Sequence, residues 1–218
     1  MGGLFAELLP EMVGLIVTPG AIAGCTLLLQ SSRPVRNPIA FGSAFLVLYT
    51  LIAVSALLGG ASEPGATSQD TAHSAGLVVG LIFVAAGCWI AVHPAGPVAS
   101  TPKWLAALQN AGPGRAFIVG LAFAMINPNL FIMVSGMSVI SSSHVGPGAA
   151  LLATLLLLAA AALDFVIPIG IYLALGERAR HGLDSVQAWM LRNNRGLTLG
   201  VLFAFGALFS IRGVLNLT

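Results

Sequence analysis

Charged residues are scarce in this chain. They make up 7% of its 218 residues, whereas a soluble domain carries about 25%. Hydrophobic residues make up 57%. A chain with so few charges cannot cover itself with a water-facing surface, which excludes an ordinary soluble domain. The net charge of +2 is too small to indicate nucleic acid as a partner.

Residues that carry catalytic or redox chemistry are also few. The 2 cysteines, Cys25 and Cys88, lie in apolar stretches without C-x-x-C spacing, which is typical of buried and inert thiols. The 4 histidines are scattered over loops and segment ends. The sequence contains no phosphate-binding loop of the Walker A kind and no nucleophile–base pair. We therefore expect no enzyme, no cofactor and no metal site.

What the chain does have is long apolar runs. A helix that crosses the hydrocarbon core needs about 20 residues. Six segments meet this length: Leu4–Gln30, Pro38–Gly60, Ser74–Val92, Arg115–Ile140, Pro147–Gly176 and Gly196–Asn216. The sequence thus predicts an all-α integral membrane protein with six transmembrane helices.

The basic residues predict the orientation of these helices, because cytoplasmic loops carry an excess of Lys and Arg. Eight of the 9 basic residues lie in three loops that a six-span arrangement places on one side: Arg33, Arg36, Lys103, Arg115, Arg178, Arg180, Arg192 and Arg195. We expect that side to be cytoplasmic in a bacterial inner membrane, with both termini outside.

A spacing that occurs twice indicates a duplication. Thr18-Pro19-Gly20 interrupts the first apolar segment, and Asn127-Pro128-Asn129 interrupts the fourth. In both halves another proline, Pro38 or Pro147, follows nineteen positions later and opens the next segment. The two units are offset by 109 residues, half of the chain. The third segments begin alike at Gly76 and Gly196, now offset by 120.

Three spans per unit is an odd number, so the two halves are expected to insert with opposite topology. The resulting domains are a first repeat over 1–92, a cytoplasmic linker over 93–114 and a second repeat over 115–218. The second repeat includes a polar segment near 177–192, which we read as a cytoplasmic surface helix, or as a linker with snorkelling arginines. Pairs of glycines, Gly76 with Gly80 and Gly196 with Gly200, predict close packing of the third helices.

Broken helices of an inverted repeat commonly frame a substrate site near the bilayer centre. The candidate site residues are therefore the two interruptions together with Asp164. Asp164 is an acidic residue deep in the fifth segment, where an ionised side chain costs about 2.5–3.5 kcal/mol. It is either a proton-coupling or substrate-binding group, or a neutral side chain that joins helices. Glu7 and Glu11, four residues apart in the first segment, are expected to be solvated at an outer helix end, with a cation site as the alternative.

The sequence also resembles a known family. The resemblance covers nearly the whole chain and is carried by Ser31–Asn37, Ala40-Phe41, Asn127-Pro128, Pro168–Leu173, Gly176–Arg180, Leu183-Asp184 and Ala188-Trp189. This arrangement is similar to the GAP family of actinobacteria within the LysE exporter superfamily. The resemblance implies six spans and a role in moving glycopeptidolipids, sulfolipids or related mycobacterial envelope lipids across the inner membrane.

This resemblance implies membrane lipids or glycolipids as ligands, and a larger lipid transporter or a second copy of the chain as partners. Family members often carry Lys after the Asn-Pro pair, where this chain has Asn129, which suggests a neutral or sugar-rich head group. Three alternatives remain: a LysE-type exporter of amino acids or cations, a membrane thiol–disulfide relay and a non-transporting scaffold. A lipid path should open sideways to the bilayer, whereas a solute path should be enclosed.

Overall fold

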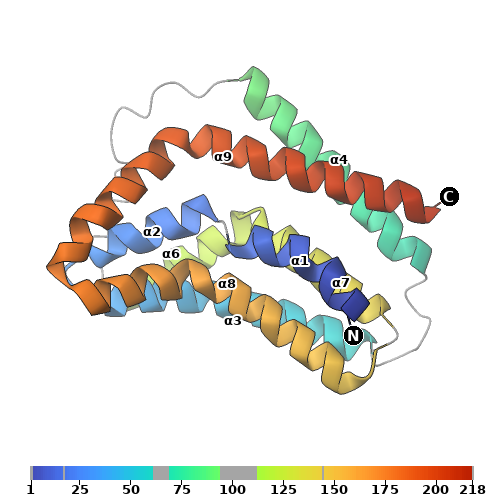
Figure 1. Ribbon diagram of the computed structural model, residues 1–218, viewed down its shortest axis with the longest axis horizontal. Coiled ribbons are helices and arrows are strands. Elements are labelled where there is room, and N and C mark those ends of the chain that lie inside the picture. Colours follow the sequence, from blue (N-terminus) through green and yellow to red (C-terminus); the bar gives the residue numbers. More distant parts are fainter. Residues whose placement is uncertain (1, 17, 61–68, 94–111, 144, 218) are drawn as a thin grey trace.

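The computed structural model describes residues 2–16, 18–60, 69–93, 112–143 and 145–217, and all regular structure in these ranges is helical. Most of the predicted linker over 93–114 lies outside them. Figure 1 shows the helices lying roughly along one long axis, with both termini at the same end. The helices are α1 (Gly2–Ile16), α2 (Pro19–Leu29), α3 (Arg36–Gly60), α4 (Gln69–Val92), α6 (Pro113–Ile126), α7 (Asn129–Ser142), α8 (Pro147–Leu175) and α9 (Glu177–Leu217).

Several helices are long and apolar enough to cross a membrane. Among the described residues, α3 over Arg36–Leu58 and α8 over Pro147–Leu175 qualify by length and composition alone. Two bent pairs raise the number to four: α1 with α2, at 42°, and α6 with α7, at 66°. The two predicted helix interruptions therefore both exist, and the chain is a membrane protein of several apolar helices.

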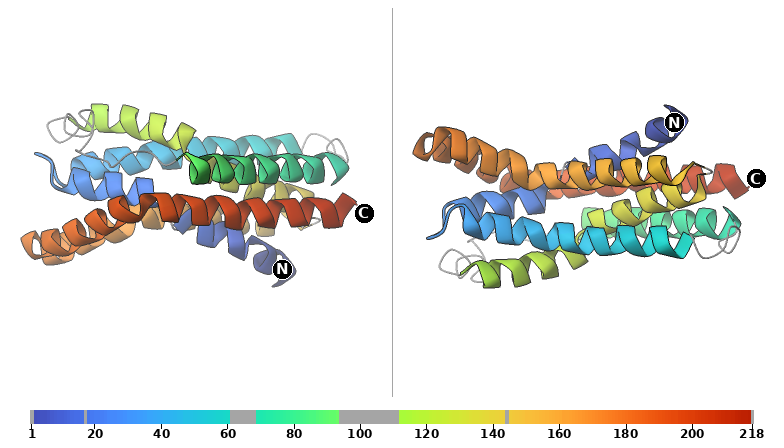
Figure 2. Two further views of the ribbon diagram at one scale, coloured as in Figure 1. Left: turned by 90° about the horizontal axis from the view of Figure 1, so that it is seen from above. Right: turned by 90° about the horizontal axis from the view of Figure 1, so that it is seen from below.

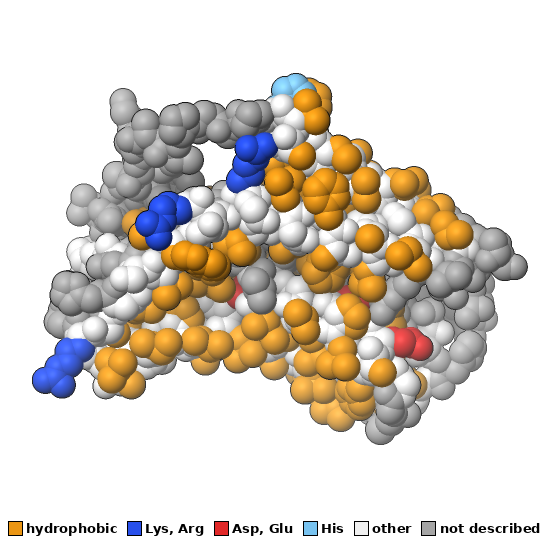
Figure 3. All heavy atoms as spheres, turned by 45° about the horizontal axis from the view of Figure 1, so that its top comes forward, with side chains coloured by type: hydrophobic (Ala, Val, Ile, Leu, Met, Phe, Trp, Pro, Cys, Tyr) orange, Lys and Arg blue, Asp and Glu red, His pale blue; other side chains and the backbone are white. Residues whose placement is uncertain are grey.

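The two ends of the bundle differ in charge. Exposed arginines lie in the half of the bundle that is far from the termini in Figure 1, which we call the basic end: Arg33, Arg36, Arg115, Arg178, Arg192 and Arg195. The opposite end, called the terminal end, carries the N- and C-termini. Figure 3 shows the Lys and Arg side chains of one face in the left half of the view, and hydrophobic side chains over the rest. Leu51 of α3 and Leu155 of α8 are among the exposed large hydrophobic residues, and such a surface suits contact with lipid tails.

An aromatic cluster joins α3 to α8 and fixes the position of the candidate acid. Phe45 lies 5.3 Å from Phe41 and 5.1 Å from Phe165, measured between ring centroids. All three rings are buried. Gly42 makes room for this contact, because a methyl group there would lie 2.6 Å from Cγ of Phe165. Asp164, the preceding residue, is thereby held against the centre of the bundle.

Helix α4 packs along the C-terminal part of α9, side by side in Figures 1 and 2. Their closest approach is at two glycines. A methyl group on Gly80 would lie 2.6 Å from the Ser210 amide nitrogen, and one on Gly206 would lie 2.8 Å from Cγ2 of Val84. The predicted role of Gly196 and Gly200 in this packing is wrong, since a methyl group on either would meet no described neighbour within 4 Å. The partner of Gly80 is Gly206 instead.

The last span and the polar segment before it form one helix. α9 runs without interruption for 41 residues from Glu177. Its first turns are anchored where Ala179 and Leu183 pack on Leu29 of α2. Farther along, Arg195 donates from Nη2 to the Ala91 carbonyl oxygen at 2.9 Å, near the C-terminus of α4, where a cation is favourable. The cytoplasmic surface position of residues 177–192 stays a prediction.

The α4–α9 contact yields a prediction with a matched control. Gly80→Leu is expected to lower the free energy of unfolding by about 1–3 kcal/mol, because the new side chain would overlap the backbone of α9. Gly200→Leu, the position that matches Gly80 in the second repeat, meets no neighbour and is expected to be nearly neutral. Thermal unfolding of the detergent-solubilised variants measures the difference, and equal losses at both positions would contradict the packing.

Candidate functional site

Both helix interruptions have the same local cause. Thr18 and Asn127 each precede a proline, and a residue before proline is driven out of the helical conformation. Both are extended, with ψ of 92° at Thr18 and 132° at Asn127. Pro19 and Pro128 then stand at the start of α2 and α7, where the missing amide hydrogen does no harm. The sequence therefore breaks both helices at matching places.

One side chain joins the two interruptions. The amide nitrogen Nδ2 of Asn129 donates to the Gly14 carbonyl oxygen at 3.3 Å, and also to Oγ1 of Thr18. Within the second interruption, the Asn129 backbone amide donates to Oδ1 of Asn127 at 3.0 Å. Asn127 thus caps the start of α7 and Asn129 ties α7 to α1. Both side chains are buried, so these bonds replace water at the breaks.

Asp164 completes this group from α8. Its Oδ1 accepts a hydrogen bond from the Thr18 backbone amide at 3.5 Å, and the residue is only 4% exposed. Pro168, four residues later in α8, has no amide hydrogen to donate to the Asp164 carbonyl oxygen. Side chain and backbone of Asp164 therefore both add polar atoms at the level of the two interruptions. We call Thr18, Asn127, Asn129 and Asp164 the break cluster.

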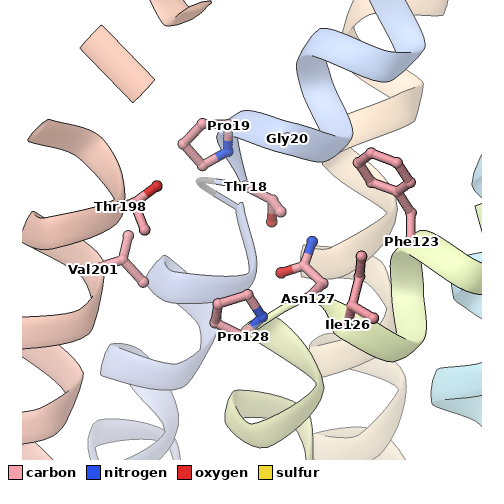
Figure 4. A pocket seen from close by; sticks show the side chains of 9 residues that line it. All are labelled: Thr18, Pro19, Gly20, Phe123, Ile126, Asn127, Pro128, Thr198 and Val201. Atoms are coloured by element: carbon pink, nitrogen blue, oxygen red, sulfur yellow. The ribbon is translucent and has the colours of Figure 1, made fainter. Parts of the chain in front are cut away.

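A pocket of about 200 Å³ opens beside the break cluster. Figure 4 shows it between α6 on one side and α9 on the other, with the two interruptions between them. Its polar lining side chains are Thr18, Asn127 and Thr198, and its apolar lining comes mainly from Phe123, Ile126 and Val201. Pro19, Gly20 and Pro128 complete the lining. No residue that is seen to line the pocket in the described part of the chain carries a charge.

The pocket reaches the surface of the bundle at the middle of its length. Ile126, the last residue of α6, lines the pocket and is 78% exposed. In the described residues α6 packs on α3 and α7, but it forms no extensive contact with α4 or α9. As far as the described residues show, the gap between α6 and α9 is therefore a lateral opening, which faces lipid tails if the bundle stands upright in a bilayer.

The structure separates the predicted site residues into two groups. Five of the seven line the pocket: Thr18, Pro19, Gly20, Asn127 and Pro128. Asn129 and Asp164 lie behind them and hold the interruptions in place. Sequence reasoning missed the four other lining residues, Phe123, Ile126, Thr198 and Val201. Only Thr198, a hydroxyl within the sixth apolar segment, offered a signal. The roles of all these residues in substrate binding stay predictions.

The expectation for Glu11 is wrong. We expected Glu7 and Glu11 to be solvated at a helix end, and Glu7 is exposed. Glu11, however, has no exposed surface and lies between α1 and α7, where the Ser135 hydroxyl donates to its Oε1 at 3.4 Å. α1 buries this face because it packs on both α7 and α8. Asp164 is thus not the only acidic residue inside the bundle.

The cysteines are both free thiols on different helices. Cys25 is buried in α2, as expected, whereas the expectation of a buried thiol is wrong for Cys88, which is exposed on α4. Neither flanks a proline of an interruption, where a membrane thiol–disulfide relay would need paired cysteines. This placement weighs against the relay as a function.

Comparison with known proteins agrees with the resemblance seen in the sequence. Residues 8–215 match the model of a family described as Sap, sulfolipid-1-addressing protein. No curated protein and no solved structure matches the chain. The match confirms the predicted family, while the wider relationship to the LysE superfamily stays a prediction.

The hydrogen bonds from the Asn129 side chain to Gly14 and Thr18 are expected to be necessary for joining the two interruptions. Asn129→Ala removes the donor to Gly14 and Thr18 and leaves buried oxygen atoms unsatisfied, which is expected to cost about 1–3 kcal/mol. Hydrogen exchange of the segment around Thr18 should accelerate accordingly. Asn193→Ala is the control, because exposed Asn193 bonds only to its own helix through the Trp189 carbonyl oxygen. Unchanged exchange in Asn129→Ala would show that these hydrogen bonds are dispensable.

Proposed function

Because the chain belongs to the sulfolipid-1-addressing protein family, we propose that it is an exporter, or an export accessory, for a polar-headed envelope lipid. In this proposal the protein is not an enzyme. It lies in the bacterial inner membrane and provides a path from one leaflet toward the other. The family description gives the link to lipids, and the pocket at the helix interruptions gives a place for the lipid to bind.

The proposal includes six spans arranged as two inverted repeats. Matching pairs of helices support it: α1 packs on α8 as α6 packs on α3, and α2 packs on α8 as α7 packs on α3. The contacts α3–α8 and α4–α9 lie where the pseudo-two-fold axis would pass. Both termini lie at the end opposite the arginines, which supports a cytoplasmic basic end and external termini.

The lateral opening at Ile126 is the observation that carries the proposal. Thr18, Asn127 and Thr198 can bind hydroxyl or carbonyl groups of a head group inside the pocket. An acyl chain attached to that head group could leave between α6 and α9 past exposed Ile126 into the bilayer. A LysE-type exporter of amino acids or cations has no use for an opening to lipid tails, so a lipid is the better match.

The chemistry of the pocket favours a neutral, sugar-rich head group. The described lining offers hydroxyl and amide groups but no Lys or Arg, and Asp164 lies just behind Thr18. An anionic head group would meet no cation among the described lining residues. Without a nucleotide-binding loop, the drive would come from the proton gradient through Asp164 or from a larger lipid transporter as partner.

Filling the pocket tests lipid binding directly. Thr198→Phe places a ring opposite Asn127 and is expected to abolish the co-purification of lipid, measured by mass spectrometry of the gently extracted protein. It should also reduce the envelope glycolipid at the cell surface. Ser142→Phe, on an exposed residue at the end of α7, is the control and should change neither quantity. Normal lipid content in Thr198→Phe would remove the pocket from consideration as the lipid site.

A second variant separates binding from coupling. Asp164→Asn keeps an oxygen that can accept from the Thr18 amide, so we expect normal protein levels and normal co-purified lipid. If Asp164 carries the proton, surface glycolipid should fall to the level of cells that lack the protein. Asn127→Ala should lower both lipid binding and export. Undiminished surface lipid in both variants, at normal protein levels, would contradict the exporter.

A further inference from the structure

The two ends of the bundle differ in which helices contact each other. At the terminal end α1 packs on α7, and the Glu11–Ser135 hydrogen bond lies in this contact. The matching helices at the basic end are α6 and α2. In the described residues they form no such contact, and they border the pocket instead. One half of an inverted repeat is thus closed and the other half is open.

A single ring seals the closed half. Phe205 of α9 is buried, and its ring lies directly on the backbone of α1 at Gly14. A methyl group on Gly14 would lie 2.7 Å from Cε2 of Phe205 and 3.0 Å from Cδ1 of Ile132. Phe209 supports the ring at a centroid distance of 5.8 Å. Three helices, α1, α7 and α9, therefore meet closely at Gly14.

At the basic end, the residues that correspond to Gly14, Ile132 and Phe205 have the opposite sizes. With the offset of 109 residues, Gly14 corresponds to Phe123 and Ile132 corresponds to Ala23. With the offset of 120 that relates the third helices, Phe205 corresponds to Ala85. The large ring is thus on α6 at the basic end, whereas it is on α9 at the terminal end. Phe123 lines the open pocket, with its ring 6.1 Å from that of Phe41.

We propose that Phe205, seated on Gly14, is the gate on the terminal side and that Phe123 is the matching gate residue on the basic side. On this assignment the terminal side is sealed, and the pocket, which α2 and α6 of the basic half border, is loaded through its lateral opening from the cytoplasmic leaflet. In the opposite state, α6 would pack on α2 in the way that α1 packs on α7 here. Phe123 would then approach Ala23 and Ala85, whose small side chains leave room for the ring. This inference rests on the proposed function and specifies from which side its site is loaded.

Cysteine labelling from each side tests the gate. Thr198→Cys in a Cys88→Ser background places a thiol in the pocket, with Cys25 buried and exposed Cys88 removed. A membrane-impermeant maleimide is applied to intact cells and to inside-out vesicles. We expect the parent protein to be labelled at least about tenfold faster from the basic side, because the terminal side is closed.

Variants of the gate should open the terminal side. Phe205→Ala is expected to raise the labelling rate from outside by about tenfold or more, because a tenfold shift needs only ~1.4 kcal/mol and a buried Phe supplies more than that. Gly14→Leu should act in the same direction by displacing the ring. Gly3→Leu is the matched control on α1, since Gly3 has no neighbour within 4 Å. Phe205→Leu replaces Phe205→Ala if the latter accumulates poorly.

Each outcome bears on the proposal. Faster labelling of the parent from outside, equal labelling from both sides, or unchanged outside labelling in Phe205→Leu and Gly14→Leu would overturn the gate. Labelling requires no lipid, so its result is separate from that of Thr198→Phe. One-sided labelling without any bound lipid would support the gate and contradict lipid export. Bound lipid with labelling from both sides would support lipid export and contradict the gate.

Discussion

The structure depends on how two broken helices satisfy their polar groups inside an apolar bundle. A helix interruption frees backbone donors and acceptors, and in a membrane each must find a partner within the protein or in a wet cavity. Here Asn129 bonds to Gly14 and Thr18, and Asp164 accepts from the Thr18 amide. These bonds hold the two interruptions together, so the pocket beside them has a fixed polar wall.

The same arrangement explains why the pocket combines a few polar side chains with a mainly apolar lining. The interruptions supply Thr18 and Asn127, whereas the intact helical faces of α6 and α9 supply Phe123 and Val201. A lipid has the same division between its head group and its chains. In the proposed function, the opening at Ile126 would accommodate both parts of the lipid at once, which an enclosed polar cavity would not permit.

The two halves differ in where small and large side chains meet. This difference accounts for the close contact at the terminal end and the pocket beside α6. Gly80 and Gly206 let α4 and α9 approach closely, and Gly14 accepts Phe205. The residue that matches Gly14 is Phe123 in the second half, and the residue that matches Phe205 is Ala85 in the first half. In the proposed inverted repeat, two halves with the same backbone plan can therefore differ in which end is sealed, and the proposed transporter would need that difference to open one side at a time.

The sequence by itself determined the membrane class, the two interruptions and the family. Composition, the length of the apolar runs and the effect of proline on its preceding residue are local properties, so the Thr18-Pro19 and Asn127-Pro128 breaks could be predicted. Tertiary structure alone decided which side chains meet. Neither the burial of Glu11, nor the choice of Gly206 over Gly200 as partner of Gly80, nor the place of Thr198 in the pocket follows from periodicity. Each depends on the rotation and offset of one packed helix against another, which local sequence does not encode.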